Sequence, residues 1–353
     1  MCLYVQMRKN KNVLRSSDER IKNEEVICMQ TNMRRIDVHH HIIPEIYRIA
    51  LEAQGVDNSG GMRIKKWTTE DSLELMDHLG IQVAIVSISE PGLIPITDIE
   101  KAKKIARAVN EFQAETIRNH PKRFGGFALI PLPSVAAALE EIRYALDELK
   151  LDGVGLFTNY QDYFLGDPIF DPIFNELNKR KAIVHIHPST SPASYIRPKY
   201  IKADFMIEFA FNTTRAATNL ILGGTIERCP DIKIILSHGG GTIPFLKERI
   251  TGSQSILEQM IGDKIYHLKK SADEYMKQFY YDTALITSAG SLNAIKETTD
   301  ISHILYGSDA HYAPEKFGNL MNQQLDQFEG FNQNELSNVL QHNALNLFSR
   351  FKS

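Results

Sequence analysis

The chain has 353 residues, with 40 Lys and Arg against 43 Asp and Glu, so its formal net charge is -3. This near balance offers no basic field for a nucleic acid or an anionic membrane surface, and we expect a small-molecule partner instead. The length suits one large α/β domain, because barrels often exceed 250 residues as a single domain. Cys2, Cys28 and Cys229 lack metal-site or disulfide spacing, which is typical of a reducing compartment.

The first 32 residues carry charges of both signs and show no helical or strand periodicity. This composition argues against a signal or transit peptide, and no stretch approaches the roughly 18 apolar residues that a membrane span needs. We therefore predict a mobile N-terminal tail over residues 1–32 and a single domain over residues 33–353. The same observations favour a cytoplasmic protein with no membrane partner.

Beyond the tail, strand-like and helix-like patterns alternate to the end of the chain. Most apolar runs are followed by a helical pattern, such as those over residues 98–120 and 134–150. Continuous apolar strands with intervening helices predict a parallel sheet covered on both faces. Eight such units favour a closed (β/α)8 TIM barrel over the alternative of an open sheet. The eight runs are RIDVH, QVAIVSI, RFGGFALI, DGVGLF, AIVHIH, IKIILSH, FYYDTA and HILYGSD.

Three connections are longer than a compact barrel requires, namely residues 50–68, 158–168 and 188–204. Each follows the carboxyl end of a predicted strand, where barrels carry their active sites. We therefore expect these loops to shape and cover a substrate pocket.

Polar side chains recur where the predicted strands end. Successive strand residues alternate between faces, so His39 and His41 share a face that His40 does not. Each histidine taken alone could be an ordinary core or loop residue. Several buried imidazoles around one barrel mouth would cost several kcal/mol without a common partner, which predicts a divalent metal. The expected ligands are His39, His41, His187 and Asp309, with His238 nearby.

Nitrogen ligands with one carboxylate suit Zn²⁺ best, although Mn²⁺ or Fe²⁺ can use similar sets. His185 has the same parity as His187 and also faces inward. His187 is the preferred ligand because it lies nearer the barrel mouth, directly before Pro188. For His185 we favour a role in the core or behind the ligands.

Several segments together resemble a known family. "IDVHHH", "VHIHP", "SHGGGTIPFLKERI", "YGSDA" and "NALNLF", in this order, resemble the amidohydrolase superfamily and its aminocarboxymuconate-semialdehyde decarboxylase branch, from about residue 34 to the end. The segments around residues 152–188 and 207–246 are most similar to the 6-methylsalicylate decarboxylase group. The resemblance implies a metal-dependent decarboxylase whose ligands match the four residues given above and whose catalytic histidine matches His238.

The resemblance also implies that Arg249 reaches the substrate carboxylate of a neighbouring subunit, which would make the protein a homodimer. The alternative is a surface residue on the helix after the sixth strand. That helix carries an apolar stripe of Ile243, Leu246 and Ile250, which could pack on its own core or on a second copy. The chain departs from the family in two ways. His311 stands where relatives more often have proline, and Arg63 is only the nearest candidate for the family's other carboxylate clamp.

The chemistry expected from the resemblance is loss of CO₂ from a small aromatic or muconate-type carboxylic acid, such as a hydroxybenzoate. Asp309, if protonated, could deliver the proton to carbon, and His238 could instead act as a base. Phe157, Tyr160 and Phe164 could stack on the substrate ring, or could pack in the core as most aromatic residues do. A metal-dependent hydrolase or hydratase on the same barrel is the alternative enzyme, and a non-catalytic binding barrel comes last.

Overall fold

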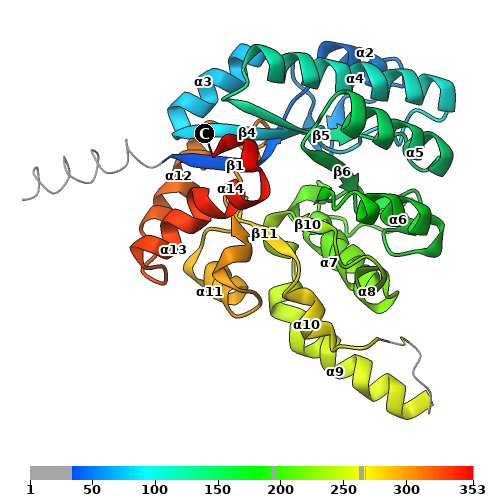
Figure 1. Cartoon of the computed structure of the whole chain (residues 1–353), viewed down its shortest axis with the longest axis vertical. Coiled ribbons are helices and arrows are strands. Elements are labelled where there is room, and N and C mark those ends of the chain that lie inside the picture. The colour runs from blue at the N-terminus through cyan, green and yellow to red at the C-terminus, as the bar shows by residue number, and fades with distance from the viewer. Residues whose placement is uncertain (1–33, 193–195, 262–265, 267, 353) are drawn as a thin grey trace, which may run out of the picture.

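The computed structural model describes residues 34–192, 196–261, 266 and 268–352, so the predicted tail over 1–32 lies outside the described residues. Eight strands form one parallel sheet in which each strand pairs with the next along the chain, and helices surround it (Figure 1). The strands are β1 (Arg35–His41), β4 (Ile81–Ser87), β5 (Phe124–Leu129), β6 (Gly153–Phe157), β9 (Ile183–His187), β10 (Lys233–Leu236), β11 (Tyr280–Asp282) and β12 (Ile304–Leu305).

The two edges of this sheet meet. The backbone N–H of Val38 in β1 donates to the carbonyl of Tyr306, at 3.0 Å, and the N–H of Asp309 donates to the carbonyl of His39, at 2.9 Å. A parallel bridge between His40 and Ala310 continues this contact. The sheet is therefore a nearly closed barrel, and the predicted (β/α)8 architecture is confirmed.

The helices that cover the barrel follow the predicted periodicity. The pattern over 98–120 forms α4, whose first turn is capped by the Asp98 carboxylate. The pattern over 134–150 forms α5 and then a π-helical turn. Within the described parts of the chain, none of the helices combines the length and the apolar character needed to cross a membrane. The α-helices of the described residues are α2 (Glu45–Glu52), α3 (Thr69–Leu79), α4 (Ile99–Asn119), α5 (Val135–Arg143), α6 (Asp171–Lys179), α7 (Glu208–Leu222), α8 (Thr225–Arg228), α9 (Ile243–Ile261), α10 (Ala272–Met276), α11 (Ala289–Lys296), α12 (Glu315–Asp326), α13 (Gln333–Ser337) and α14 (Asn343–Leu347).

The inside of the barrel is apolar at one end. Ile36, Val83 and Leu305 form a buried cluster there with Phe127. The ring of Phe348, just after α14, packs edge-on against Phe127, with ring centroids 6.0 Å apart. This packing fills the end where the strands begin, so the polar side chains of the barrel interior gather at the end where the strands finish.

Candidate active site

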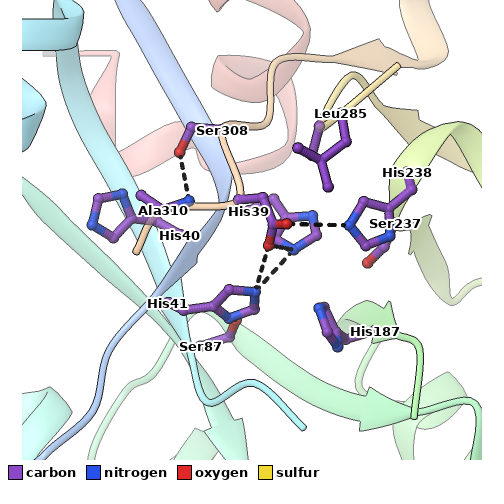
Figure 2. Close-up of polar contacts among 12 residues, drawn as sticks. His39, His40, His41, Ser87, His187, Ser237, His238, Leu285, Ser308 and Ala310 are labelled. Atoms are coloured by element: carbon purple, nitrogen blue, oxygen red, sulfur yellow. Dashed lines mark hydrogen bonds and ion pairs between the residues drawn. The ribbon is translucent and has the colours of Figure 1, made fainter. Parts of the chain in front are cut away.

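Four histidines and an aspartate converge where β1, β9, β10 and β12 end (Figure 2). His39 Nε2 lies 3.0 Å from His41 Nε2, and His41 Nε2 lies 3.1 Å from Asp309 Oδ1. His40 points away from this cluster, as strand alternation predicted, and its Nε2 contacts Ser72 Oγ of α3 at 2.9 Å. The cluster thus draws its members from strands that are far apart in the sequence.

The cluster has the composition of a metal site. One potential ligand atom from each of His39, His187, His238 and Asp309 lies within 4.8 Å of every other, and all four residues are buried. His41, which contacts both His39 and Asp309, adjoins this group. The structure therefore brings the four expected ligands together, and it sets His238 among them rather than to one side.

The donor atoms also fit a divalent cation. His238 Nε2 is buried, has no hydrogen-bond partner among the described residues, and lies 3.6 Å from Asp309 Oδ2. His187 Nδ1–H donates to the carbonyl of Pro188, at 2.8 Å, which leaves Nε2 as the free ligand atom. A buried imidazole nitrogen whose lone pair meets no hydrogen-bond donor destabilises the folded state. Coordination of that lone pair to a cation removes this cost.

Asp282, at the end of β11, hydrogen-bonds to two residues of this cluster. The sequence patterns did not lead us to predict this role. Asp282 Oδ2 accepts a hydrogen bond from His39 Nδ1–H at 2.8 Å, and its Oδ1 accepts one from the backbone N–H of His238 at 2.9 Å. The carboxylate thereby fixes the ring of one histidine and the backbone of the other. A signal was present, because Asp282 is a carboxylate near the carboxyl end of the predicted run FYYDTA, as Asp309 is at the end of HILYGSD.

The protonation of the cluster follows from its burial and its carboxylates. Burial lowers the pKa of His39, but Asp282 and Asp309 outweigh it and raise that pKa to about 10. Burial lowers the pKa of His41 to about 4. For Asp309, burial raises the pKa, yet the imidazoles of His238 and His39 beside its carboxylate hold that pKa well below the ordinary range. Asp309 is therefore a carboxylate, the form that a ligand needs.

The backbone at the site adopts an unusual conformation. His238, Leu285 and Asp309 have φ of 53°, 60° and 58°, in the left-handed region that side chains other than glycine rarely adopt. Such residues cost on the order of 1 kcal/mol each and cluster at functional sites. This conformation turns three side chains from three strand ends toward the same space.

His185 lies one layer below the cluster. Its ring stacks on Phe127, with centroids 5.3 Å apart and planes 17° apart, and its Nε2 lies 3.2 Å from Ser237 Oγ. A second possible ligand group joins His185 to His39 and Asp282. The contacts agree with the expected role of His185 in the core and behind the ligands.

A cavity of about 440 Å³ opens above the cluster. The loop 50–68 contributes to it, as expected, whereas among the described residues none of 158–168 or 188–204 lines it. Phe157 and Tyr160 are buried in the core and Phe164 packs against it, so these three rings do not line the cavity either. The residues that do are Ser59, Met62, Ser89, His187, Phe205, Phe209, Ala210, His238, Gly241, Leu285, Ile286, Asp309, Tyr312, Ala313, Pro314 and Phe317.

The other residues named from the family pattern lie outside the lining of this cavity. Arg249 is exposed on α9, and Arg63 is exposed on the short strand β3 (Met62–Arg63). His311 packs behind β1, where its Nε2 lies 2.8 Å from Ser72 Oγ. The described part of one chain therefore places no lysine or arginine in the lining of the cavity.

Comparison with known proteins agrees with this geometry. Residues 36–350 match the amidohydrolase family model, so the chain belongs to the amidohydrolase family. It is 36% identical over 335 residues to the decarboxylase macB of Penicillium terrestre, covering 91% of this chain and 96% of macB. It is also 36% identical over 331 residues to the 6-methylsalicylic acid decarboxylase acuB of Aspergillus aculeatus, covering 90% of this chain and 97% of acuB.

A solved structure supports the fold. The 5-carboxyvanillate decarboxylase of Novosphingobium aromaticivorans, complexed with manganese and 4-hydroxy-3-methoxy-5-nitrobenzoic acid, has a TM-score of 0.78 at 19% identity. The match covers 91% of this chain and 97% of that one. The agreement in fold over nearly the whole chain is consistent with the barrel described above.

Proposed function

We propose that the protein is a metal-dependent, non-oxidative decarboxylase of a small aromatic carboxylic acid of the hydroxybenzoate class. The observation that carries the proposal is the buried cluster of four histidines and Asp309, of which His187, His238 and Asp309 line a cavity large enough for an aromatic ring. The relatives named above support decarboxylation as the reaction. Muconate-type acids are the second substrate class to be tested.

We propose His39, His41, His187 and Asp309 as the metal ligands and Zn²⁺ as the metal, with Mn²⁺ as the alternative. The described lining of the cavity contains no lysine or arginine. When bound, a divalent cation would supply the positive charge that the substrate's oxygens need. Asp282 holds the His39 ring in place through Nδ1.

In the reaction the bond between the ring carbon and the carboxylate breaks, CO₂ leaves, and the electron pair stays on the ring carbon. That carbon takes one proton, so a carboxylate and a proton become an arene and CO₂. We propose His238 as the group that handles this proton, because its Nε2 faces the cavity floor without a hydrogen-bond partner among the described residues. Since Asp309 is held as a carboxylate, we propose it as a ligand first and as the proton donor only in second place.

The test is to incubate the metal-loaded protein with a panel of hydroxybenzoates and muconate-type acids. We expect release of CO₂ in equal amount to the phenol formed. Addition of water to the substrate without CO₂ release would contradict the proposal and favour the hydrolase or hydratase alternative.

A second measurement tests the metal site directly. We expect about one divalent metal per chain, and His41→Ala should lose most of it by elemental analysis because a metal with incomplete ligation binds far more weakly. His78→Ala, which changes a half-exposed histidine on α3, is the matched control. Unchanged metal content in His41→Ala would contradict the assignment.

A further inference from the structure

The cavity above the cluster is polar at its floor and apolar toward its mouth. His187, His238 and Asp309 line the floor and are 4%, 8% and 7% exposed. Phe205, Leu285 and Phe317 line the same cavity, and they are 44%, 38% and 43% exposed. The polar groups therefore lie deep, and large apolar side chains lie where the cavity meets solvent.

The apolar mouth is built by three separate elements. Phe205 lies in a 3-10 turn before α7, Leu285 follows β11, and Phe317 lies in the first turn of α12. Figure 2 draws Leu285 near His238, and both side chains line the cavity. Exposed apolar side chains that converge from three elements on one opening mark a binding surface for an apolar group.

The cavity is larger than one ring requires. A cavity of about 150 Å³ suffices to hold benzene, whereas this one has about 440 Å³. Met62, Phe209 and Ile286 add apolar surface to the same lining, which also contains the hydroxyl-bearing side chains Ser59, Ser89 and Tyr312. With no lysine or arginine in the described lining, a second carboxylate or phosphate on the substrate would have no cationic partner there.

We propose that the substrate carries an unbranched alkyl group longer than methyl, which runs from the ring past Phe209 to the mouth between Phe205, Leu285 and Phe317. This inference rests on the proposed decarboxylase function and narrows its substrate class to hydroxybenzoic acids that carry such an alkyl group, with 6-alkyl-2-hydroxybenzoic acids as the series tested. The reacting carboxylate lies at the floor, and the alkyl arm contributes only to binding.

The physical basis is transfer of the arm out of water. Each buried CH₂ group is worth about 0.8 kcal/mol, which corresponds to a factor of about four in affinity. Because the arm is remote from the reacting carbon and is bound in both the ground state and the transition state, it should lower KM and leave kcat nearly constant.

The first experiment compares the 6-methyl, 6-propyl and 6-pentyl acids with the metal-loaded enzyme. We expect kcat/KM for CO₂ release to rise several-fold with each added methylene, chiefly through KM, until the arm passes the mouth. The inference would be overturned if the methyl acid were turned over and kcat/KM stayed flat or fell with chain length.

A binding measurement separates this inference from the proposed reaction. Calorimetry with 3-methylphenol, 3-propylphenol and 3-pentylphenol, the products expected from these acids, should give a Kd that falls about fourfold per methylene. If none of the acids released CO₂, the proposed reaction would be wrong. The Kd values of the phenols would still test whether the cavity binds an alkyl arm. Equal Kd values across the phenols would overturn the inference whatever the reaction is.

A variant at the mouth tests the location. Phe317→Ser should reduce the ratio of the pentyl to the methyl kcat/KM by about threefold to tenfold, because it removes apolar surface from the arm's path. Ile46→Ser, which changes a side chain of α2 with 47% exposure that does not line the cavity, should keep the ratio. An unchanged ratio in Phe317→Ser would overturn the assigned path.

Discussion

His238 is the residue on which the proposed proton transfer depends. Its backbone N–H is held by Asp282, and its Nε2, which has no hydrogen-bond partner among the described residues, lies at the cavity floor 3.6 Å from Asp309 Oδ2. We expect His238→Asn to lose on the order of a hundredfold or more in kcat while it keeps the metal and the fold. Metal content by elemental analysis and kcat from CO₂ release are measured on the same sample, with His78→Asn as the control.

Two outcomes would contradict this role. Loss of the metal from His238→Asn would identify His238 as a ligand, which its position in the group of four also allows. A kcat of His238→Asn near that of the wild type would show that His238 has a structural role and does not handle the proton.

Glu90 is a buried carboxyl away from the metal cluster. Its Oε1 accepts a hydrogen bond from Thr190 Oγ1 at 2.6 Å, and its Oε2 is buried without a hydrogen-bond partner among the described residues. Burial raises the pKa of this carboxyl above its ordinary value of 4.5, and the bond from Thr190 opposes the rise only in part. The folded state therefore holds this proton more tightly than the unfolded state does.

The sign of the pH dependence follows. The stability that the protonated carboxyl contributes is fully present below the unfolded pKa, and it is lost as the pH rises through the higher pKa of the folded state. Glu90→Gln keeps an acceptor for Thr190 and cannot ionise, so we expect its stability relative to wild type to increase with pH. Urea unfolding of both proteins at matched metal content, from about pH 5 to pH 8, is the measurement. A constant difference across that range would contradict the prediction.

At the scale of elements, the turn between β10 and α9 depends on a glycine. Gly241 has φ of 67°, and a Cβ at this position would collide with the carbonyl oxygen of Ala210 in α7. Gly241 and Ala210 both line the cavity, so this close approach of turn and helix forms part of its wall. Only glycine combines this φ with this approach.

Gly241→Ala should therefore destabilise the protein by several kcal/mol or prevent its folding, since both strain and collision add to the cost. Gly252→Ala is the matched control. Gly252 lies within α9, and a Cβ added there would meet no atom of the described residues within 4 Å, so alanine should stabilise the helix by about 0.5–1 kcal/mol. Thermal and urea unfolding of both variants is the measurement. Equal effects of the two substitutions would contradict the role of Gly241.

At the scale of the whole molecule, α9 is the element that projects from the barrel (Figure 1). The predicted stripe packs at least partly on its own chain, because Ile243 is buried in the core and Ile250 packs against that core. Other apolar side chains of α9 face outward, with Phe245, Ile256 and Met260 being 88%, 57% and 78% exposed. Such a surface is suited to a second copy of the chain.

The proposed homodimer and the proposed role of Arg249 are tested together. Arg249→Ala chains and Asp309→Asn chains should each be inactive alone, whereas a mixture that exchanges subunits should recover part of the activity. One site of each heterodimer would then combine an intact metal site with a donated arginine. A monomer by analytical ultracentrifugation, or no rescue in a mixture shown to exchange, would remove this role of Arg249.

The sequence by itself determined the barrel, and it predicted which side chains would meet at one rim of it. Continuous apolar runs with intervening helical patterns predicted the correct order of eight strands, and the confirmed family followed from motifs at their ends. His39, His187 and Asp309 could be expected to meet because the carboxyl ends of parallel strands in a barrel lie on one rim. These features are local in the chain or follow from topology alone.

Only the tertiary structure decided how the rest of the chain surrounds that rim. Phe205, Leu285 and Phe317 form one mouth although they belong to different elements, whereas Phe157, Tyr160 and Phe164, which the sequence made candidates for the pocket, pack with the core. Asp282 became a partner of His39 through a contact across 243 positions. Which side chains line a cavity depends on packing between distant segments, and no local periodicity encodes the distances that this packing sets.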